Sequence, residues 1–222
     1  MVAAFRFALA AIFICALCVF LPLTNIYILL SPAFLRYEYS ILPPALSLSP
    51  GERLALAERC AFYLHSSSGI ELLAEMRDSN GNPIFTWREL AHMEDVKVLF
   101  RKALLVHALS GIAAFLAGSV LELKGETGKR VPFYIAISCA LLAAGLIIIG
   151  TLIFLNFDFL FASFHRLFFE GDSWLFAYTD TLIQLFPLRF WVDSAMAWAF
   201  LTLGETVALG LGALAWRRAA GG

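Results

Sequence analysis

Four long apolar runs constrain this chain more than any other feature of its sequence. They cover residues 7–30, 103–121, 132–156 and 190–216. Each reaches about 20 residues, the length that an α-helix needs to cross the ~30 Å hydrocarbon core of a bilayer. The chain is also 61% hydrophobic, whereas soluble domains are about 45–50% apolar. We therefore predict an all-α, polytopic membrane protein with four transmembrane helices, in which residues 1–222 form a single membrane domain.

The charged residues exclude one function class and predict the orientation. The formal net charge is −1, and the scattered basic residues form no face for binding a nucleic acid. Cytoplasmic loops of membrane proteins carry an excess of Lys and Arg. Here the short connections contain Arg6, Lys124, Lys129, Arg130, Arg217 and Arg218. We therefore expect both termini to be cytoplasmic, and segments 31–102 and 157–189 to form a small helical cap on the extracytoplasmic side.

The first outside segment contains clear helix signals. The prolines between residues 31 and 50 predict a rigid, non-helical exit from the membrane, since proline fixes φ and lacks an amide proton. Ser49 followed by Glu52 predicts a capping box at the start of a helix. Thr86 followed by Glu89 predicts a second helix, which continues without a breaker into the second transmembrane run.

The second outside segment, 157–189, is dense in phenylalanine and tryptophan. Aromatic residues near the ends of transmembrane helices usually occupy the headgroup zone. We expect 157–169 to continue the third transmembrane helix outward or to form an interfacial helix, and 170–172 to end it. A short helix is expected over 179–186.

Two of the four histidines lie in these outside segments close to the predicted membrane boundary. A neutral imidazole can accept a proton near pH 7 and return it, so His92 and His165 are candidate catalytic residues. His65 is expected to end a helix. His107 lies inside the second transmembrane run, where we expect a polar packing role.

Carboxylates accompany the two candidate histidines. Asp95 and Asp180 are the best placed in sequence to accept a hydrogen bond from an imidazole and fix its tautomer. The same four side chains leave a zinc site open as an alternative, although the sequence has no HExxH motif. Cys15 and Cys18 have CxxC spacing but lie one helical turn apart inside the first apolar run, where we expect packing rather than metal binding. We expect no metal and no other cofactor.

Two sequence blocks resemble the lipoprotein intramolecular transacylase family of bacterial integral membrane proteins. The first is His92-Met93-Glu94-Asp95-Val96-Lys97, and the second extends from Phe164 to Phe190 with the elements FHRLFF and TDTLIQLFP. The resemblance covers most of the chain. It implies an acyltransferase that moves the sn-2 acyl chain of a diacylglyceryl-cysteine lipoprotein to the α-amine of the same N-terminal cysteine.

The resemblance also implies which residues form the site. The catalytic residues would be His92, His165, Asp95 and Asp180. The substrate would contact Arg88, Lys97, Phe164, Phe168, Phe169 and Trp174, with the aromatic residues against the acyl chains. We hypothesise that one histidine deprotonates the amine while the other protonates the leaving glyceryl oxygen, and which does which stays open. The implied partners are diacylated bacterial lipoproteins and lipid of the cytoplasmic membrane, with the oligomeric state open.

Two other functions compete with this interpretation. A metal-dependent membrane hydrolase would use His92, Asp95 and His165 as ligands, and a chelator would inhibit it. A non-catalytic accessory membrane protein would tolerate replacement of both histidines.

Overall fold

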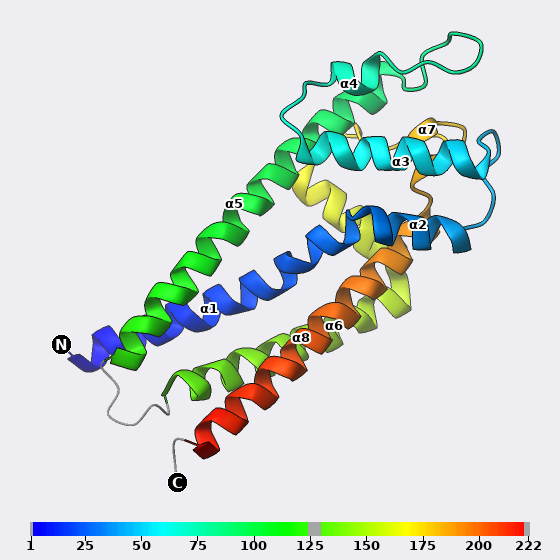
Figure 1. The fold of residues 1–222 in the computed structure, drawn as a ribbon. Helices are drawn as coiled ribbons and strands as arrows, with labels where there is room; N and C mark the ends of the chain where they lie inside the picture. The colour runs from blue at the N-terminus through cyan, green and yellow to red at the C-terminus, as the bar shows by residue number, and fades with distance from the viewer. Residues whose placement is uncertain (1, 124–129, 220–222) are drawn as a thin grey trace. The chain divides into compact units, whose positions relative to one another are not determined.

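The structure is a computed structural model that describes residues 2–123 and 130–219. Four of its helices are long: α1 (Val2–Leu29), α5 (Trp87–Leu123), α6 (Arg130–Phe168) and α8 (Leu188–Ala219) (Figure 1). Each is long and apolar enough to cross a membrane. The prediction of an all-α membrane protein with four transmembrane helices is confirmed.

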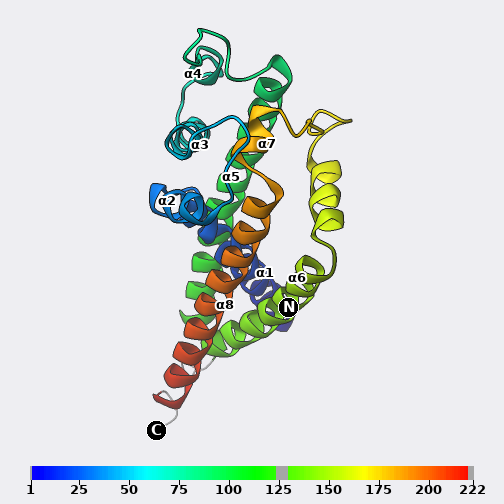
Figure 2. The same ribbon diagram turned by 90° about the vertical axis from the view of Figure 1, so that its right-hand side faces the viewer.

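The remaining helices are short. They are α2 (Pro32–Ile41), α3 (Pro50–His65), α4 (Glu71–Ala74) and α7 (Thr181–Leu185). Figures 1 and 2 show α2 and α3 side by side. The part of the chain that the structure describes has no β-strand and only an isolated bridge between Arg77 and Pro83.

The sequence prediction of a non-helical exit over 31–50 is wrong for its first half, where α2 forms. Ser31 is the N-cap of α2, and its hydroxyl oxygen accepts a hydrogen bond from the amide of Phe34 at 3.2 Å. Pro32 occupies the first turn of the helix. Proline is tolerated there because the amide groups of the first turn have no partner inside the helix. A proline therefore started this helix rather than preventing it.

The two predicted capping boxes are confirmed. The Glu52 carboxylate accepts from the Ser49 amide at 3.0 Å and the Ser49 hydroxyl accepts from the Glu52 amide, which starts α3. The Glu89 carboxylate accepts from the Thr86 amide at 2.8 Å at the start of α5. Such reciprocal bonds satisfy amide groups that a helix terminus otherwise leaves unpaired.

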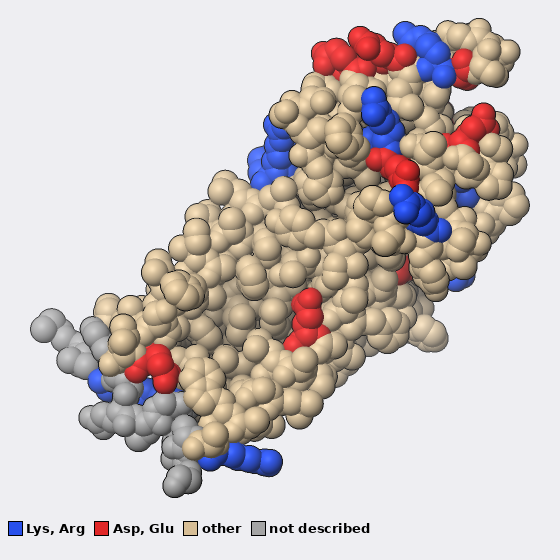
Figure 3. All heavy atoms as spheres, in the orientation of Figure 1, with Lys and Arg blue, Asp and Glu red and all other residues tan. Residues whose placement is uncertain are grey.

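The chain divides into two compact units. Unit 1 consists of Met1–Ile26, Ala103–Thr151 and Ala197–Gly222, and unit 2 of Tyr27–Lys102 and Leu152–Met196. On the face drawn in Figure 3, charged side chains are sparse over the long helices of unit 1 and frequent over the short helices of unit 2. The single-domain organisation expected from the sequence stays a prediction.

In unit 1, helices α1 and α5 pack closely through glycine. A Cβ atom added to Gly118 would lie 2.9 Å from the Phe13 ring, and one added to Gly111 would lie 2.8 Å from the Phe20 ring. Phe13 is buried in a core cluster with Ala16 and Ala114. Small residues let helix backbones approach each other in membrane proteins, where packing rather than hydrophobicity drives association.

Replacing Gly118 with leucine is expected to lower the free energy of unfolding by about 1–3 kcal/mol, because the added side chain would displace the Phe13 ring from its buried cluster. The thermal midpoint of the purified protein in detergent measures this loss. Gly204→Leu is the matched control, since a Cβ at Gly204 meets no atom within 4 Å. Equal midpoints for the two variants would contradict the packing argument.

Unit 1 also contains a polar contact inside the predicted transmembrane helices. The Asn25 side-chain amide donates to Thr202 Oγ1 and to Glu205 Oε2, both at 3.1 Å. Asn25 and Thr202 are fully buried. Glu205 thus has a protein partner, as expected for an ionisable residue in a transmembrane helix.

In unit 2, Glu38 on α2 is a buried carboxyl group. It is 1% exposed, and its Oε1 atom has no hydrogen-bond partner among the described residues. Burial, together with the charge and the hydrogen bond of the nearby Asp193, raises the pKa of Glu38 to about 7.

This shift predicts a pH-dependent stability. An unfolded glutamate has a pKa of about 4.3, so between about pH 4.5 and 7 the folded state binds more protons than the unfolded state. The stabilisation is complete below this window and is lost as the pH rises through 7. We expect wild type to lose about 1–2 kcal/mol more than Glu38→Gln between pH 5 and pH 8. Thermal unfolding at both pH values measures this, and parallel losses would contradict it.

Candidate active site

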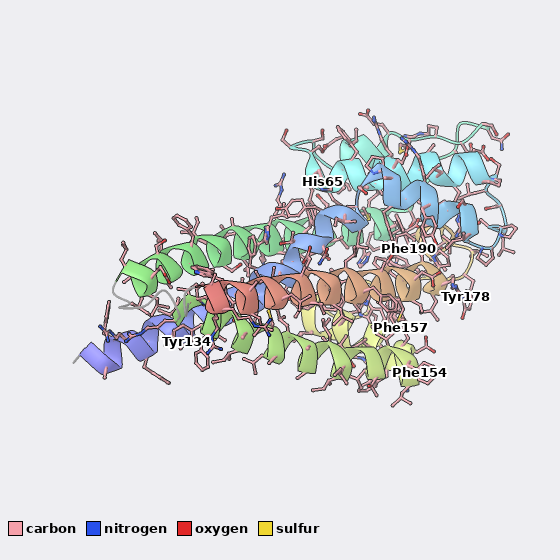
Figure 4. The ribbon with its side chains drawn as sticks, turned by 60° about the horizontal axis from the view of Figure 1, so that its bottom comes forward. His65, Tyr134, Phe154, Phe157, Tyr178 and Phe190 are labelled. Carbon is pink, nitrogen blue, oxygen red and sulfur yellow. The ribbon has the colours of Figure 1, made fainter. Side chains whose placement is uncertain are left out.

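Helix α6 carries His165 on a segment that begins at a backbone break. Asn156 has φ −161° and ψ 79°, which interrupts the helical conformation. Its side-chain oxygen accepts from the amide of Phe159 at 3.0 Å and so starts the helix again. Figure 4 labels Phe154 and Phe157, which flank this break. Residues 157–168 are helical, as predicted, and whether they continue the third transmembrane helix outward or form an interfacial helix stays a prediction.

The structure brings the two candidate histidines together within unit 2. The ring centroids of His92 on α5 and His165 on α6 lie 6.2 Å apart, with an angle of 21° between the ring planes. Both side chains are buried, at 9% and 8% exposure. Nothing in the sequence established that they meet.

Aromatic rings surround both imidazoles. The His92 ring lies 4.9 Å from Phe169 and 5.4 Å from Phe176, measured between centroids. The His165 ring lies 4.1 Å from Phe161 and 4.9 Å from Trp174. We call these four rings and Phe164, which is 5.5 Å from His165, the aromatic box. Low-polarity surroundings disfavour a charged imidazolium.

One hydrogen bond fixes the tautomer of His165. Its Nδ1 atom lies 2.8 Å from the backbone carbonyl oxygen of Phe161. A carbonyl oxygen only accepts, so Nδ1 carries the proton and donates it. The Nε2 atom of His165 then keeps its lone pair and can act as a base.

His92 has a different hydrogen-bonding state. Its Nδ1 atom is buried and has no hydrogen-bond partner among the described residues. Buried polar atoms are rarely left unpaired in folded proteins, and exceptions often mark sites of function. A substrate group that reaches His92 would therefore gain a buried nitrogen as its partner.

Asp95 and Asp180, the two carboxylates predicted to orient the histidines, have other surroundings in the structure. Asp95 is exposed and does not contact either imidazole ring. Asp180 precedes α7, where its carboxylate accepts from the amide of Ala177 at 2.8 Å. The backbone carbonyl of Phe161 takes the position at His165 that the sequence assigned to an aspartate. An orienting role for Asp95 and Asp180 stays a prediction.

Glu89, which was predicted from the sequence only as a helix cap, is a buried carboxylate that connects α5 to α7. Glu89 is fully buried, and besides capping α5 it accepts from the amide of Leu182 on α7 at 2.7 Å. The neighbouring Arg88 donates to the carbonyl of Leu175 at 2.9 Å. These two bonds hold the chain on both sides of Phe176, whose ring contacts His92.

The carbonyl groups at the C-terminal end of α7 accept hydrogen bonds from two residues that were not predicted from the sequence as part of the site. Arg53 on α3 is buried and donates to the carbonyl of Gln184 at 2.7 Å. Tyr39 on α2 donates to the carbonyl of Leu185 at 2.7 Å. Cations and donors are favourable at a helix C-terminus, where carbonyl groups are unpaired.

The predicted substrate-binding residues fall into two groups. Phe164, Phe169 and Trp174 belong to the aromatic box, and Phe168 packs on Phe164 at 4.8 Å. Lys97 lies elsewhere: its ammonium donates to the carbonyl of Ser68 at 2.6 Å and lies 3.9 Å from the centre of the Tyr63 ring. Its predicted contact with the substrate stays a prediction.

Two members of the aromatic box, Phe161 and Phe176, were not predicted from the sequence. Phe161 precedes His165 by one helical turn, so the i, i+4 spacing on α6 could have identified it. Phe176 lies in an irregular segment between α6 and α7, where no periodicity relates it to His92. Among residues 2–123 and 130–219, no group of three or more His, Cys, Asp or Glu side chains is arranged to hold a metal ion.

Comparisons with known proteins point to one family. The family model described as "Lipoprotein intramolecular transacylase Lit" matches residues 9–191. An uncharacterized protein of Aquifex aeolicus (strain VF5) is 34% identical over 176 residues, which are 78% of this chain and 77% of that protein.

Two solved structures share the fold. One is the membrane integral lipoprotein intramolecular transacylase Lit from Bacillus cereus, with a TM-score of 0.78, 18% identity and coverage of 97% of both chains. The other is a variant of that protein with a histidine replaced by arginine, with a TM-score of 0.57, 19% identity and coverage of 96% of this chain and 88% of that one.

Proposed function

Because this chain belongs to the lipoprotein intramolecular transacylase family, we propose that its two buried histidines carry out the acyl transfer of that family. The chain is a multi-pass membrane protein and an acyltransferase. The observation that supports the proposal is the meeting of His92 and His165 inside the aromatic box, 6.2 Å apart.

The substrate is proposed to be a diacylated lipoprotein. The transfer breaks the ester bond between the sn-2 oxygen of the glyceryl group and its acyl carbon, and forms an amide bond between that carbon and the α-nitrogen of the N-terminal cysteine. One proton passes from the nitrogen to the released glyceryl oxygen. Amine and ester belong to one molecule, so positioning can supply a large part of the rate.

His165 is the proposed general base. An α-amine has a pKa of about 7.7–8, so a neutral fraction is present near pH 7 to attack the ester. Nε2 of His165 accepts the proton that the nitrogen loses during this attack and then returns it to the leaving glyceryl oxygen. A single histidine can perform both steps, as in serine hydrolases.

His92 is the proposed hydrogen-bond donor to the ester. Its apolar surroundings favour the neutral ring, which carries one N–H group. That group can stabilise the negative charge that develops on the acyl oxygen during attack. We do not divide the proton transfers evenly between the two histidines. Charging both rings would be costly, because they lie 6.2 Å apart inside the aromatic box.

In the proposed orientation, the two histidines lie on the same side of the membrane as the glyceryl ester of the proposed lipoprotein substrate. With both termini in the cytoplasm, unit 2 residues 31–102 and 157–189 lie at the extracytoplasmic face of the bacterial cytoplasmic membrane. The glyceryl ester of a lipoprotein anchored in the outer leaflet lies at the same level, and its acyl chains extend into the bilayer.

Expression in a bacterium that makes diacylated lipoproteins tests the proposal. Mass spectrometry of the N-terminal lipopeptides is expected to show one O-linked and one N-linked acyl chain with the wild-type protein. Unchanged diacyl lipopeptides, with the protein folded and inserted, would contradict it. Inhibition of purified protein by a chelator would favour the metal-dependent hydrolase instead.

A further inference from the structure

The segment between α6 and α7 supplies much of the aromatic box without the support of a helix. Residues 169–180, all of which the structure describes, form turns and irregular backbone. They carry Phe169, Trp174 and Phe176. Irregular segments are generally more mobile than the elements they connect. The positions of these rings against the two imidazoles therefore depend on bonds that the segment and its flanks make to other elements.

Backbone and side-chain groups in and just after this segment are hydrogen-bonded to the start of α5. Arg88 donates to a carbonyl within the segment at 2.9 Å, but its side chain is exposed, so water competes for the bond. The Thr181 hydroxyl donates to the carbonyl of Ile84 at 2.7 Å. The Leu182 amide donates to Oε1 of Glu89, also at 2.7 Å, and this bond is buried. The bond to Glu89 is thus the best shielded from water.

Glu89 accepts hydrogen bonds through both of its carboxylate oxygens. Oε2 accepts from the amide and from the hydroxyl of Thr86, at 2.8 and 2.9 Å, which caps α5. Oε1 accepts from the amide of Leu182, the second residue of α7. Amides in the first turn of a helix have no partner inside the helix, so this amide needs an acceptor from elsewhere. Glu89 is 0% exposed, so water does not replace these donors.

Only a group that accepts at both ends can bridge these donors. An ionised carboxylate accepts through two oxygens, whereas an amide side chain presents one acceptor and one NH2 donor. In Glu89→Gln the carbonyl oxygen is favoured at the position that faces two donors, which keeps the cap on Thr86. The NH2 group then faces the Leu182 amide, and two donors oppose each other. This substitution therefore removes the bond to α7 while it keeps the helix cap and the side-chain volume.

We propose that Glu89 is a positioning residue: by fixing the start of α7 it holds the preceding segment, and with it the Phe176 ring, against His92 during acyl transfer. The inference rests on the proposed function. Glu89 precedes His92 by three residues on α5, so one helix carries the histidine and fixes the ring that lies 5.4 Å from it. All of these residues belong to unit 2. Glu89 acts through His92 rather than on the reacting atoms.

Glu52 offers a matched control within the same unit. It forms the same kind of capping box at the start of α3, and the two bonds that it accepts from Ser49 both use Oε2. Its side chain is exposed. A glutamine at this position keeps both bonds through its carbonyl oxygen and turns its NH2 group to solvent. Glu52→Gln therefore makes the same chemical change without removing a bond to another element.

Kinetics of the purified protein with a synthetic diacylglyceryl-cysteine lipopeptide test the inference. For Glu89→Gln we expect kcat per folded protein to fall about tenfold while KM stays within about twofold, because the substitution misplaces a group that acts in the transition state. Glu52→Gln is expected to keep the wild-type kcat and KM. Thr86→Ala weakens the cap of α5 but leaves the bond to α7, so it should lower the thermal midpoint and keep kcat.

Three kinetic outcomes would overturn the inference: a wild-type kcat in Glu89→Gln, a rise in its KM without a fall in kcat, or an equal fall in kcat for Thr86→Ala. If Glu89→Gln does not fold, Thr181→Val replaces it, because it removes the neighbouring bond to Ile84 and keeps the size of the side chain. For Thr181→Val we expect kcat to fall about threefold, and an unchanged kcat would overturn the inference.

A second measurement separates this inference from the proposed function. Trp174 lies in the irregular segment, 4.9 Å from the His165 ring, and subtracting the spectrum of the matching Trp174→Phe variant isolates its fluorescence. In Glu89→Gln this component is expected to shift to longer wavelength, because the segment moves into water, and Glu52→Gln should leave it unchanged. If wild type transfers no acyl chain but the shift occurs, the proposed function fails and positioning by Glu89 stands. An unshifted component in Glu89→Gln would overturn the inference.

Discussion

Replacing His165 with alanine is expected to lower the rate of acyl transfer by about 10³-fold or more, within the upper range for loss of a positioned general base. The reason is geometric: the Phe161 carbonyl fixes the proton on Nδ1, so Nε2 is available to accept a proton. Initial rates with a synthetic diacyl lipopeptide, at equal amounts of folded protein, measure the loss.

The control for this variant is another histidine of the same unit. His65 ends α3, is exposed, and donates from Nδ1 to the carbonyl of Ala61 at 3.0 Å (Figure 4). It therefore has the same kind of local hydrogen bond, but its side chain is exposed and packs on the Phe100 ring, 5.0 Å away, rather than inside the aromatic box. His65→Ala is expected to keep nearly the full rate. A rate for His165→Ala within a few-fold of wild type would remove His165 from the mechanism.

Replacing His92 with alanine is expected to lower the rate by about 10²-fold, the loss typical of one hydrogen-bond donor to a developing oxyanion. His92 packs against Phe169 and Phe176, so alanine would also leave a cavity. The thermal midpoint of the variant must therefore be measured alongside its rate.

His92→Asn separates the two chemical roles open to this residue. Asparagine keeps an N–H donor but cannot shuttle a proton. If His92 acts as a neutral donor, His92→Asn should recover part of the activity that His92→Ala loses. Equal, complete losses in both variants would indicate that His92 itself transfers a proton, and that the reaction divides between two histidines.

The sequence predicted the parts of the fold that depend on local patterns. Transmembrane length follows directly from runs of apolar residues, and both capping boxes follow from the spacing of Ser49 and Glu52 and of Thr86 and Glu89. The helix at Pro32 was missed because a proline in a cluster of prolines was interpreted as a break. Its position immediately after Ser31 was the better indicator, since N-cap serine followed by proline starts a helix.

The site was predictable in its residue types but not in its arrangement. The residues His92 and His165 are separated by two transmembrane runs, and no periodicity relates positions on different helices. The same limit explains why Asp95 was predicted as a site residue, whereas Glu89 was predicted only as a helix cap. Asp95 follows His92 closely in sequence but is exposed, whereas Glu89 is buried through a bond to Leu182, a residue far along the chain.

An isotope crossover measurement tests the central claim, transfer within one molecule, most directly. Two lipopeptides are mixed with the purified protein, one with deuterated acyl chains and the other with a ¹³C-labelled peptide. Mass spectrometry then reads the N-acylated products. We expect each product to carry either the deuterium or the ¹³C, and none to carry both, because amine and ester react inside one substrate at the two histidines. Products that combine a deuterated N-linked chain with a ¹³C peptide would contradict the account.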